Sequence, residues 1–598
     1  MEILNGIKTS SDVKKLSVKE LEQLSKELRD RIFEVTKSNG GHLSSNLGVT
    51  DLTTALYSVF DFPKDKLIFD VGHQCYAHKM LSGRNDLFDK VRTADGISGF
   101  PNKFESEYDT FTVGHAGTSI ASSLGVCSAR DAKGEDYFVI NVVGDGSFVN
   151  GLNLEAFYAK TFKPKKLIVI LNDNGMSISK NKNGFYKFLN KRTLGKGYRS
   201  GKGVIKKIFG ESFITKFLRK VKNAIKRLFN RNVHLENFGF KYVGVIDGND
   251  MKELTKVLNS VKRIASEKAV LLHVKTTKGL GFNKTEADSG KYHGVGIHHE
   301  VNQSAFSQTV GKAIDEIIES DPSVVAITAG MTAGTGLLPV EKNHPNNFFD
   351  VGIAEEYAVT FSAGLSAGGL KPIVCIYSTF LQRAYDQILH DVCLQSLPVV
   401  FLIDRAGLVG ADGETHQGVF DLSYLSHLPN LKIFAPSTES ELVCTLKYAL
   451  TLSCPVAIRY PNGNGYLDRE FFPYEQGLWE EINEGKDITV LAVGPRTLSI
   501  AKEYANRSKK SVRVISARTI KPLDEKILKE ISTKPIMVLE ENSEIGGLSS
   551  LVMDYYAKEN IQAIVKPFGI KDAFVSQGTL AEQLEENGIT VEKLIENE

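Results

Sequence analysis

The feature that most constrains this fold is a set of six short apolar segments, each closed by a turn rich in Gly, Asp or Asn. They are YFVINVVGDG (137–146), KLIVILNDNG (166–175), VVAITAGM (324–331), PVVFLIDRAG (398–407), DITVLAVG (487–494) and KPIMVLEEN (534–542). A helical pattern follows each turn, and this alternation indicates parallel sheets buried on both faces. We therefore predict an α/β fold with mostly parallel sheets in three domains, at about 1–300, about 301–475 and about 476–598.

The composition favours a water-soluble protein over a membrane-spanning or disulfide-rich one. The chain has 598 residues, of which 42% are hydrophobic and 24% charged, as in an ordinary water-soluble protein. The sequence shows no signal peptide and no apolar run long enough to span a bilayer. Its six cysteines lie far apart without a C-x-x-C pair. We therefore expect reduced thiols in a cytoplasmic protein, and neither a disulfide framework nor a zinc site.

A strongly basic stretch runs from Lys180 to Arg231. It holds 17 Lys and Arg residues and a single acid, Glu211, although the whole chain has a net charge of only +2. Such a block attracts nucleic acid or an anionic membrane. Its apolar residues between Phe213 and Leu228 recur at helical spacing, as they do in a membrane-surface helix. We favour a mobile insertion that packs weakly on the first domain, and we expect no nucleic-acid partner.

Two strand ends carry a metal-binding pattern. Asp145 stands in a GDG turn after one predicted strand, and Asn174 stands in NDN after the next. Ligands of open parallel sheets bind at the carboxyl ends of the strands, where these residues lie. Carboxylate and amide oxygens suit the Mg²⁺ that neutralises a diphosphate, and Gly146 lets backbone N–H groups turn toward phosphate. A lone GDG is usually only a turn, but GDG followed by N-x-N resembles the pattern of thiamine-diphosphate enzymes.

Further matching stretches run along nearly the whole chain. They are GGHLSSNLGV, DVGHQCYAHK, NDNGMSIS, KGLGF, YHGVG, FDVGIAEE, IYSTFLQRAYDQILHDV, IDRAGLVGADGETHQGVFDLSYL, APS and RYP. On these stretches the chain resembles the 1-deoxy-D-xylulose-5-phosphate synthases. The long central run separates this family from transketolases and from pyruvate dehydrogenase components, which share only the cofactor motif.

The resemblance implies a transketolase-like fold with three α/β domains, an active site between the first two domains, and a homodimer. It implies thiamine diphosphate and Mg²⁺ as cofactors. The implied reaction condenses pyruvate with glyceraldehyde 3-phosphate, with loss of carbon dioxide, to 1-deoxy-D-xylulose 5-phosphate. That product feeds isoprenoid, thiamine and pyridoxal synthesis.

The resemblance also assigns roles to residues that match the family motifs. Glu355 would hydrogen-bond the cofactor's aminopyrimidine ring, and the other catalytic residues would be His42, His293 and His416. The cofactor would contact His73, Gly114, His115, Ala116, Gly146, Ser147, Asn174, Phe282 and Glu355. The metal would be held by Asp145, Asn174 and Met176. The acceptor site would contain Tyr377, Phe380, Arg383, Arg405, Asp412 and Arg459.

The chemistry of these side chains agrees with the assigned roles. Neutral imidazole suits proton transfer near pH 7, and the planar fork of arginine suits a phosphate. Taken alone, a Glu in a first helical turn is explained by the helix dipole, and an Arg by an ion pair. The surrounding motifs therefore carry the assignments.

Several motif positions depart from the family pattern. GHSSTS is GHAGTS here, AEQH is AEEY, RYPRG is RYPNG, and the common AMTAGMAFEAL after GDG is SFVNGLNLEAF; the changed residues include Ala116, Gly117, Glu356, Tyr357, Phe282 and Asn462. These departures leave two alternatives open. One is a carboligase or transketolase-like enzyme with another acceptor, and the other is a non-catalytic protein that retains the fold. The intact Asp145, Asn174 and Glu355 favour the synthase.

Overall fold

The computed structural model describes residues 2–159, 164–175, 238–299, 304–465, 473–474 and 478–598. Met176 and the basic stretch from Lys180 to Arg231 lie outside the described residues, so the predictions made for them stay predictions. The chain forms two compact units, one of Met1–Asp89 and Phe100–His299 and the other of Lys90–Gly99 and Glu300–Glu598. The short segment 90–99 thus belongs to the second unit, although its neighbours in sequence belong to the first.

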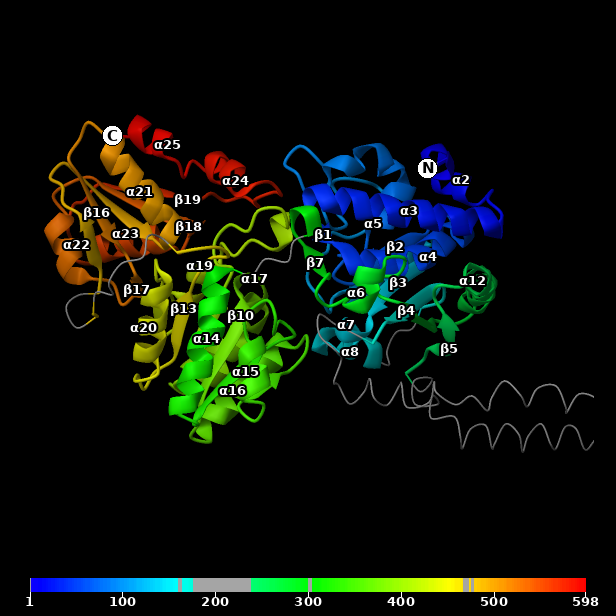
Figure 1. Ribbon diagram of the computed structural model, residues 1–598, viewed down its shortest axis with the longest axis horizontal. Coiled ribbons are helices and arrows are strands. Elements are labelled where there is room, and N and C mark those ends of the chain that lie inside the picture. The colour runs from blue at the N-terminus through cyan, green and yellow to red at the C-terminus, as the bar shows by residue number, and fades with distance from the viewer. Residues whose placement is uncertain (1, 160–163, 176–237, 300–303, 466–472, 475–477) are drawn as a thin grey trace, which may run out of the picture. The chain divides into compact units, whose positions relative to one another are not determined.

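The first unit is built on a parallel sheet of five strands in the order β2-β3-β4-β6-β5 (Figure 1). Its strands are β2 (Lys66–Phe69), β3 (Val139–Gly144), β4 (Leu167–Asp173), β5 (Lys241–Asp247) and β6 (Val270–Lys275), and a separate antiparallel pair joins β1 (Gly41–His42) to β7 (Gly294–Val295). Every residue of β4 is buried, which explains its unbroken apolar sequence.

The helices of the first unit cover this sheet and carry loops at its edge. They are α1 (Glu2–Gly6), α2 (Ser10–Val13), α3 (Val18–Asn39), α4 (Leu43–Val59), α5 (Tyr76–Lys79), α6 (Ser119–Lys133), α7 (Asp145–Phe148), α8 (Gly151–Tyr158), α12 (Met251–Ala265) and α13 (Asn283–Ala287). Helix α3 starts at a capping box, in which Ser17 and Glu20 satisfy each other's backbone N–H groups, and it ends at Gly40 with φ +71°. Helix α6 packs on β3, and α12 packs on β5 and β6.

The second unit contains two sheets. The larger has the order β17-β12-β13-β11-β10-β8-β9 and is parallel except for β17. Its strands are β8 (Val324–Thr328), β9 (Phe348–Asp350), β10 (Lys371–Tyr377), β11 (Val400–Asp404), β12 (Lys432–Phe434), β13 (Val456–Arg459) and β17 (Thr519–Lys521). The smaller has the order β14-β16-β15-β18-β19, with β14 antiparallel; its strands are β14 (Glu480–Asn483), β15 (Ile488–Val493), β16 (Val512–Ser516), β18 (Ile536–Ser543) and β19 (Val565–Ile570).

Helices flank both sheets of the second unit. They are α14 (Ala305–Ser320), α15 (Leu338–Asn343), α16 (Glu355–Ala367), α17 (Ser378–Leu381), α18 (Tyr385–Gln387), α19 (Asp421–Leu425), α20 (Glu439–Ala449), α21 (Pro495–Arg507), α22 (Glu525–Ile531), α23 (Leu548–Lys558), α24 (Leu580–Glu586) and α25 (Val591–Glu596). Strand β17 comes from the C-terminal part of the chain but pairs with β12 of the larger sheet. One hydrophobic core runs through both sheets, from Val325 to Tyr556. The predicted α/β fold with mostly parallel sheets is confirmed, and the division of the chain into three domains stays a proposal.

Candidate functional site

Asp145 and Asn174, two of the three predicted metal ligands, follow neighbouring strands at the carboxyl end of the first sheet. Gly144, at the end of β3, is in register with Asn172, near the end of β4. The N–H of Gly175 donates to the Asp145 carboxylate at 3.0 Å and to the Asp173 carboxylate at 3.1 Å. The turn after β4 therefore closes on the turn after β3, as expected for neighbouring parallel strands. Asn174 lies half-buried in this turn.

The electrostatics of this edge suit a bound cation. Burial, reinforced by the charge of Asp173, raises the pKa of Asp145 to about 7. A buried carboxylate of this kind needs a positive neighbour to be charged near neutral pH, and hard oxygen donors are the ligands that Mg²⁺ prefers. Asp173 itself is engaged by His273, whose Nε2 lies 3.0 Å from its carboxylate. Lys278 is also buried beside this group, and burial lowers the pKa of its ammonium to about 8.

A metal site of three or more His, Cys, Asp or Glu residues is not found in the described part of the chain. The predicted donor set at the ends of β3 and β4 is of another kind, since it combines the Asp145 carboxylate with the Asn174 amide oxygen. Asp145 and Asn174 thus fit the donor set of a magnesium site that is completed by a diphosphate.

The loop that carries Gly114, His115, Ala116 and Gly117 is held by a carboxylate that sequence reasoning missed. Asp70, directly after β2, accepts the N–H of Gly117 at 2.9 Å and the N–H of Ser119 at 3.1 Å. It also accepts the side-chain amide of Asn153 at 3.0 Å. Asp70 is only 1% exposed, so these three donors depend on it. The only signal in the sequence was its place in the DVGHQ motif.

Two departures from the family pattern, at Gly117 and in the segment that contains Asn150, fit each other sterically. Gly117 has φ +88°, and a Cβ atom added there would lie 2.1 Å from Oδ1 of Asn150. Asn150 is fully buried at the start of α8, within the SFVNGLNLEAF segment that differs from the family pattern. The amide of Asn150 thus fills the space that a serine side chain at position 117 would need. Ser147 and Gly146 are buried in α7, next to Asp145.

Three of the predicted histidines lie together in the first unit. The ring centroids of His42, His73 and His293 are 5.1 to 5.6 Å apart. Burial, with the charge of Lys278 second, holds the pKa of His293 well below its usual value. Nδ1 of His293 lies 3.1 Å from the Ser45 hydroxyl. A neutral imidazole in this cluster is suited to accept or donate a proton near pH 7.

Asn46 connects two of these histidines and was missed by sequence reasoning. Its side-chain amide donates to the carbonyl of His42 at 2.6 Å and to the carbonyl of His73 at 2.7 Å. Its Oδ1 accepts the N–H of Tyr76 at 2.8 Å. A single buried side chain therefore fixes the backbone of both histidines relative to each other.

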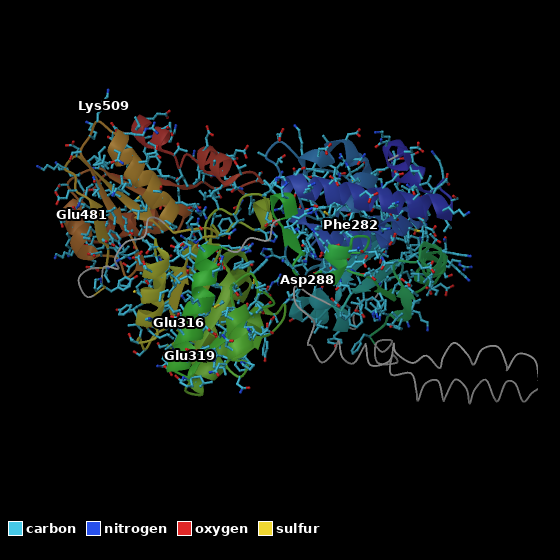
Figure 2. The ribbon with its side chains drawn as sticks, in the orientation of Figure 1. Phe282, Asp288, Glu316, Glu319, Glu481 and Lys509 are labelled. Carbon is cyan, nitrogen blue, oxygen red and sulfur yellow. The ribbon has the colours of Figure 1, made fainter. Side chains whose placement is uncertain are left out.

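Phe282 lies elsewhere in the first unit. Its ring stacks on Phe33 of α3 with centroids 4.1 Å apart and an interplanar angle of 15°. Figure 2 labels Phe282 among the side chains of the first unit. His299 in turn meets Phe33 edge-on at 4.6 Å. A cofactor role for Phe282 stays a prediction, since in the structure this ring packs on α3.

In the second unit, Glu355 opens α16 and is 4% exposed. Burial raises its pKa, against the charge of Arg383, whose guanidinium donates to the carboxylate at 3.2 Å. Arg383, predicted to bind the acceptor, thus pairs with Glu355. A buried carboxyl whose pKa is raised can share a proton with a ring nitrogen, which is the task predicted for Glu355.

The predicted acceptor residues form a second cluster. The Arg405 guanidinium lies 4.0 Å from the centre of the Tyr377 ring, which stacks on Phe380. Phe380 meets the His416 ring edge-on at 5.7 Å. Burial lowers the pKa of His416, so its imidazole is neutral at pH 7.

Two further arginines, Arg92 and Arg459, each bond a carboxylate. Arg92, from the segment 90–99, donates to the Asp412 carboxylate at 2.5 Å. Sequence reasoning missed Arg92 because no motif contains it. Arg459 instead bonds the Asp421 carboxylate at 3.0 Å and the Glu541 carbonyl at 3.3 Å. Its predicted contact with the acceptor stays a prediction.

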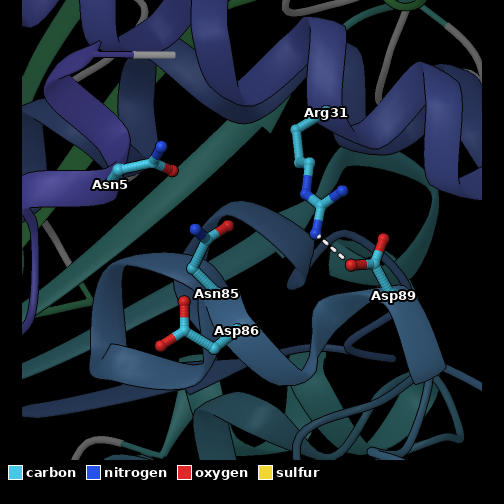
Figure 3. Close-up of a pocket in the computed structure, with 5 residues that line it drawn as sticks. All are labelled: Asn5, Arg31, Asn85, Asp86 and Asp89. Atoms are coloured by element: carbon cyan, nitrogen blue, oxygen red, sulfur yellow. Dashed lines mark hydrogen bonds and ion pairs between the residues drawn. The ribbon is translucent and has the colours of Figure 1, made fainter.

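A shallow pocket in the first unit lies apart from these clusters. Its lining residues are Asn5, Arg31, Asn85, Asp86 and Asp89 (Figure 3). Arg31 pairs with Asp89 at 2.8 Å, which offsets part of the negative charge of the pocket lining. None of the predicted site residues lines it, and we assign it no function.

Comparison with known proteins decides the family. The chain is 44% identical to a 1-deoxy-D-xylulose-5-phosphate synthase of Clostridium tetani, over 99% of this chain and 98% of that protein. It is 46% identical to one of Carboxydothermus hydrogenoformans, with the same coverage. The chain belongs to the 1-deoxy-D-xylulose-5-phosphate synthase family.

The domain families match in the order expected of a 1-deoxy-D-xylulose-5-phosphate synthase. Residues 4–276 match the family described as 1-deoxy-D-xylulose-5-phosphate synthase, residues 302–466 the transketolase pyrimidine-binding domain, and residues 477–594 the transketolase C-terminal domain. The fold is therefore of the transketolase-like, thiamine-diphosphate-binding kind. Among the described residues we find no helix with both the length and the apolarity needed to cross a membrane.

Proposed function

We propose that this protein condenses pyruvate with D-glyceraldehyde 3-phosphate, with loss of carbon dioxide, to give 1-deoxy-D-xylulose 5-phosphate. The observation that carries the proposal is the acceptor cluster, in which Arg405 lies on Tyr377 and Asp412 pairs with Arg92, in a chain of this family. Arg405 supplies the fixed positive charge that an aldehyde phosphate requires, while Arg92 offsets the charge of Asp412.

Thiamine diphosphate, when bound, supplies the carbon nucleophile that adds to pyruvate and stores the electrons left by carbon dioxide. Asp145 and Asn174 would hold the Mg²⁺ of its diphosphate, and Met176 remains the predicted third ligand. Glu355 would exchange a proton with the aminopyrimidine ring, which its buried and partly neutralised carboxyl favours. The loop from Gly114 to Gly117 would present its backbone to the cofactor, because Ala116 and Gly117 carry no hydroxyl.

The chain's other polar groups would act on the substrates. His42 and His293 are placed to move protons, since their rings are close and His293 is neutral. Arg405 would bind the acceptor phosphate, with Phe380 and Tyr377 lining the pocket. His416, neutral and next to Phe380, would act on the acceptor's oxygen atoms.

We further propose a homodimer that works in the cytoplasm. All six cysteines are free thiols in the structure, and four of them are buried, which suits a reducing compartment.

The test is carbon dioxide release from pyruvate with thiamine diphosphate and Mg²⁺, with and without glyceraldehyde 3-phosphate, and with the product identified by mass spectrometry. We expect acceptor-stimulated release and a five-carbon ketose phosphate. Glu355→Ala is the control and should abolish both. Release that ignores this acceptor would keep the cofactor chemistry but assign another acceptor, and no release from a protein that binds the cofactor would contradict the proposal.

A further inference from the structure

The loop between β11 and α19 carries three of the proposed acceptor residues, Arg405, Asp412 and His416. This loop is supported by residues that lie far along the chain. The N–H of Leu408 donates to the Glu541 carboxylate at 3.0 Å, and the carbonyl of Leu408 accepts from Arg496 at 3.1 Å. Arg496 also bonds the same Glu541 oxygen at 2.5 Å, which closes a three-membered network.

Gln583 of α24 makes the most specific contact with the loop. Its Oε1 accepts the N–H of Gly410 at 3.0 Å, and its Nε2 donates to the carbonyl of Gly410 at 3.0 Å. The same Nε2 donates to the Ser576 carbonyl at 2.8 Å. Gln583 is 2% exposed, so water cannot replace these bonds easily. Gly410 lies only two residues before Asp412.

The C-terminal part of the chain also holds the far end of the loop. The amide of Gln417 donates to the Val575 carbonyl at 3.3 Å, and the N–H of Ser543 donates to the Val419 carbonyl at 2.7 Å. Leu408 and Val419 share an apolar cluster whose other buried members are Ile570, Val575 and Ile589. The loop is thus anchored at both ends and near its middle.

Residues 575–583 also contact the segment 90–99, which carries Arg92, the residue that pairs with Asp412. The Gln577 amide donates to the Gly96 carbonyl at 3.3 Å, within the segment 90–99 that carries Arg92. A Cβ atom added at Gly578 would lie 3.5 Å from Cβ of Ala94. Residues 575–583 therefore contact both the loop of Asp412 and the segment of Arg92.

We propose that the C-terminal part of the chain sets the geometry of the acceptor site, and that Gln583 is a positioning residue for the loop that carries Asp412. This inference rests on the proposed function. A loop that loses its anchor samples more conformations, and apparent affinity falls in proportion to the fraction that remains competent. Positioning by Gln583 therefore affects the acceptor and leaves binding of pyruvate and cofactor unchanged.

The test compares Gln583→Met with the wild-type full-length protein. Methionine keeps the length of the side chain but removes both bonds to Gly410. We expect the KM for glyceraldehyde 3-phosphate to rise about tenfold, because a buried donor and acceptor are left unpaired. The KM for pyruvate and the affinity for thiamine diphosphate should change by less than about twofold, well below the change expected for one lost buried hydrogen bond. Gln583→Asn, which keeps both a donor and an acceptor on a side chain one methylene shorter, should give a smaller rise.

Tyr556→Phe is the matched control. Tyr556 is buried in the same C-terminal region, and its hydroxyl donates to the Leu528 carbonyl at 2.7 Å, at residues that make none of the loop contacts described above. This variant should leave both KM values unchanged. Hydrogen exchange of residues 405–420 without substrates gives a readout independent of turnover, and exchange should quicken in Gln583→Met and stay unchanged in Tyr556→Phe.

Unchanged exchange in the loop of Gln583→Met would overturn the inference, and so would an equal rise in the KM values of acceptor and pyruvate. If Gln583→Met does not fold, Gln583→Asn is judged by the same two readouts. If the wild-type protein makes no product from these substrates, the proposed function fails, and loop exchange alone then decides whether Gln583 positions the loop.

Discussion

Residues 114–119 in the first unit and residues 405–420 in the second form loops whose backbone is held by one buried side chain. That side chain is Asp70 in the first unit and Gln583 in the second. Asp70 lies directly after a strand and holds a loop some 47 residues away, between neighbouring elements of one sheet. Gln583 comes from a helix 173 residues away and satisfies both the N–H and the carbonyl of Gly410 in a long loop. The charged local anchor fixes residues 114–119 to the sheet, whereas the neutral distant anchor makes residues 405–420 depend on the C-terminal fold.

Among the substitutions that test this difference between the two loops, we expect the largest loss of stability at Asp70. Asp70→Ala leaves the N–H groups of Gly117 and Ser119 and the Asn153 amide without their acceptor. We expect a loss of about 3–5 kcal/mol in the free energy of unfolding of the first unit, since each unpaired buried donor costs about 1–3 kcal/mol. Hydrogen exchange of the β4 amides would measure it.

Asp70→Asn keeps one acceptor oxygen and should lose less. Loop 405–420 should exchange at the wild-type rate in both variants. If Asp70→Ala left the exchange of the β4 amides unchanged, the loop of residues 114–119 would not depend on this carboxylate.

A second prediction concerns the fit between Gly117 and Asn150. Gly117→Ser alone should destabilise the first unit and weaken thiamine diphosphate binding, because the new Cβ meets the Asn150 amide. Asn150→Ala in the same chain should restore about 2 kcal/mol, a coupling typical of residues in direct contact. The backbone strain at φ +88° would remain as a smaller residual loss.

The double-mutant cycle is measured by thermal unfolding and by titration with thiamine diphosphate. Additive effects of the two substitutions would contradict the fit. Gly134→Ser, at a glycine with φ +68° and no atom within 4 Å of its Cβ position, is the control for strain without a clash.

A third prediction uses the buried histidine cluster. Burial, followed by the charges of Lys278, His73 and His42, lowers the pKa of His293 in the folded state below the ordinary value of 6.5. Below pH 6.5 the unfolded chain takes up a proton at His293 that the folded chain does not, so this group reduces stability as the pH falls. At pH 5.5 the loss should be about 1 kcal/mol relative to neutral pH.

His293→Gln should remove that part of the pH dependence, as measured by urea unfolding at pH 7.5 and 5.5. His390→Gln, at an exposed histidine of the second unit whose pKa is raised by Asp391, is the control and should not flatten the profile. An unchanged slope in His293→Gln would show that the folded and unfolded proteins bind a proton at this histidine equally well, which would contradict a lowered pKa.

The smallest effect is expected at Arg92. Arg92→Met removes the pair with Asp412, which is partly exposed and therefore contributes only about 1 kcal/mol. We expect the KM for glyceraldehyde 3-phosphate to rise about fivefold, with the KM for pyruvate unchanged. The effect should shrink at high salt, because a partly exposed ion pair is screened. A larger change for pyruvate than for the acceptor would contradict the placement of Arg92 in the acceptor cluster.

The sequence by itself determined the α/β class, the edge where Asp145 and the NDN turn meet, and the position of Glu355 at a helix start. These follow from short-range patterns, because an apolar strand, its closing turn and the next helix are neighbours in the chain. Only the tertiary structure decided that segment 90–99 joins the second unit, that Arg383 pairs with Glu355, and that Asp70 and Gln583 anchor the two loops. A carboxylate or amide can satisfy any buried donor that comes within reach, so its partner is chosen by the packing of distant elements.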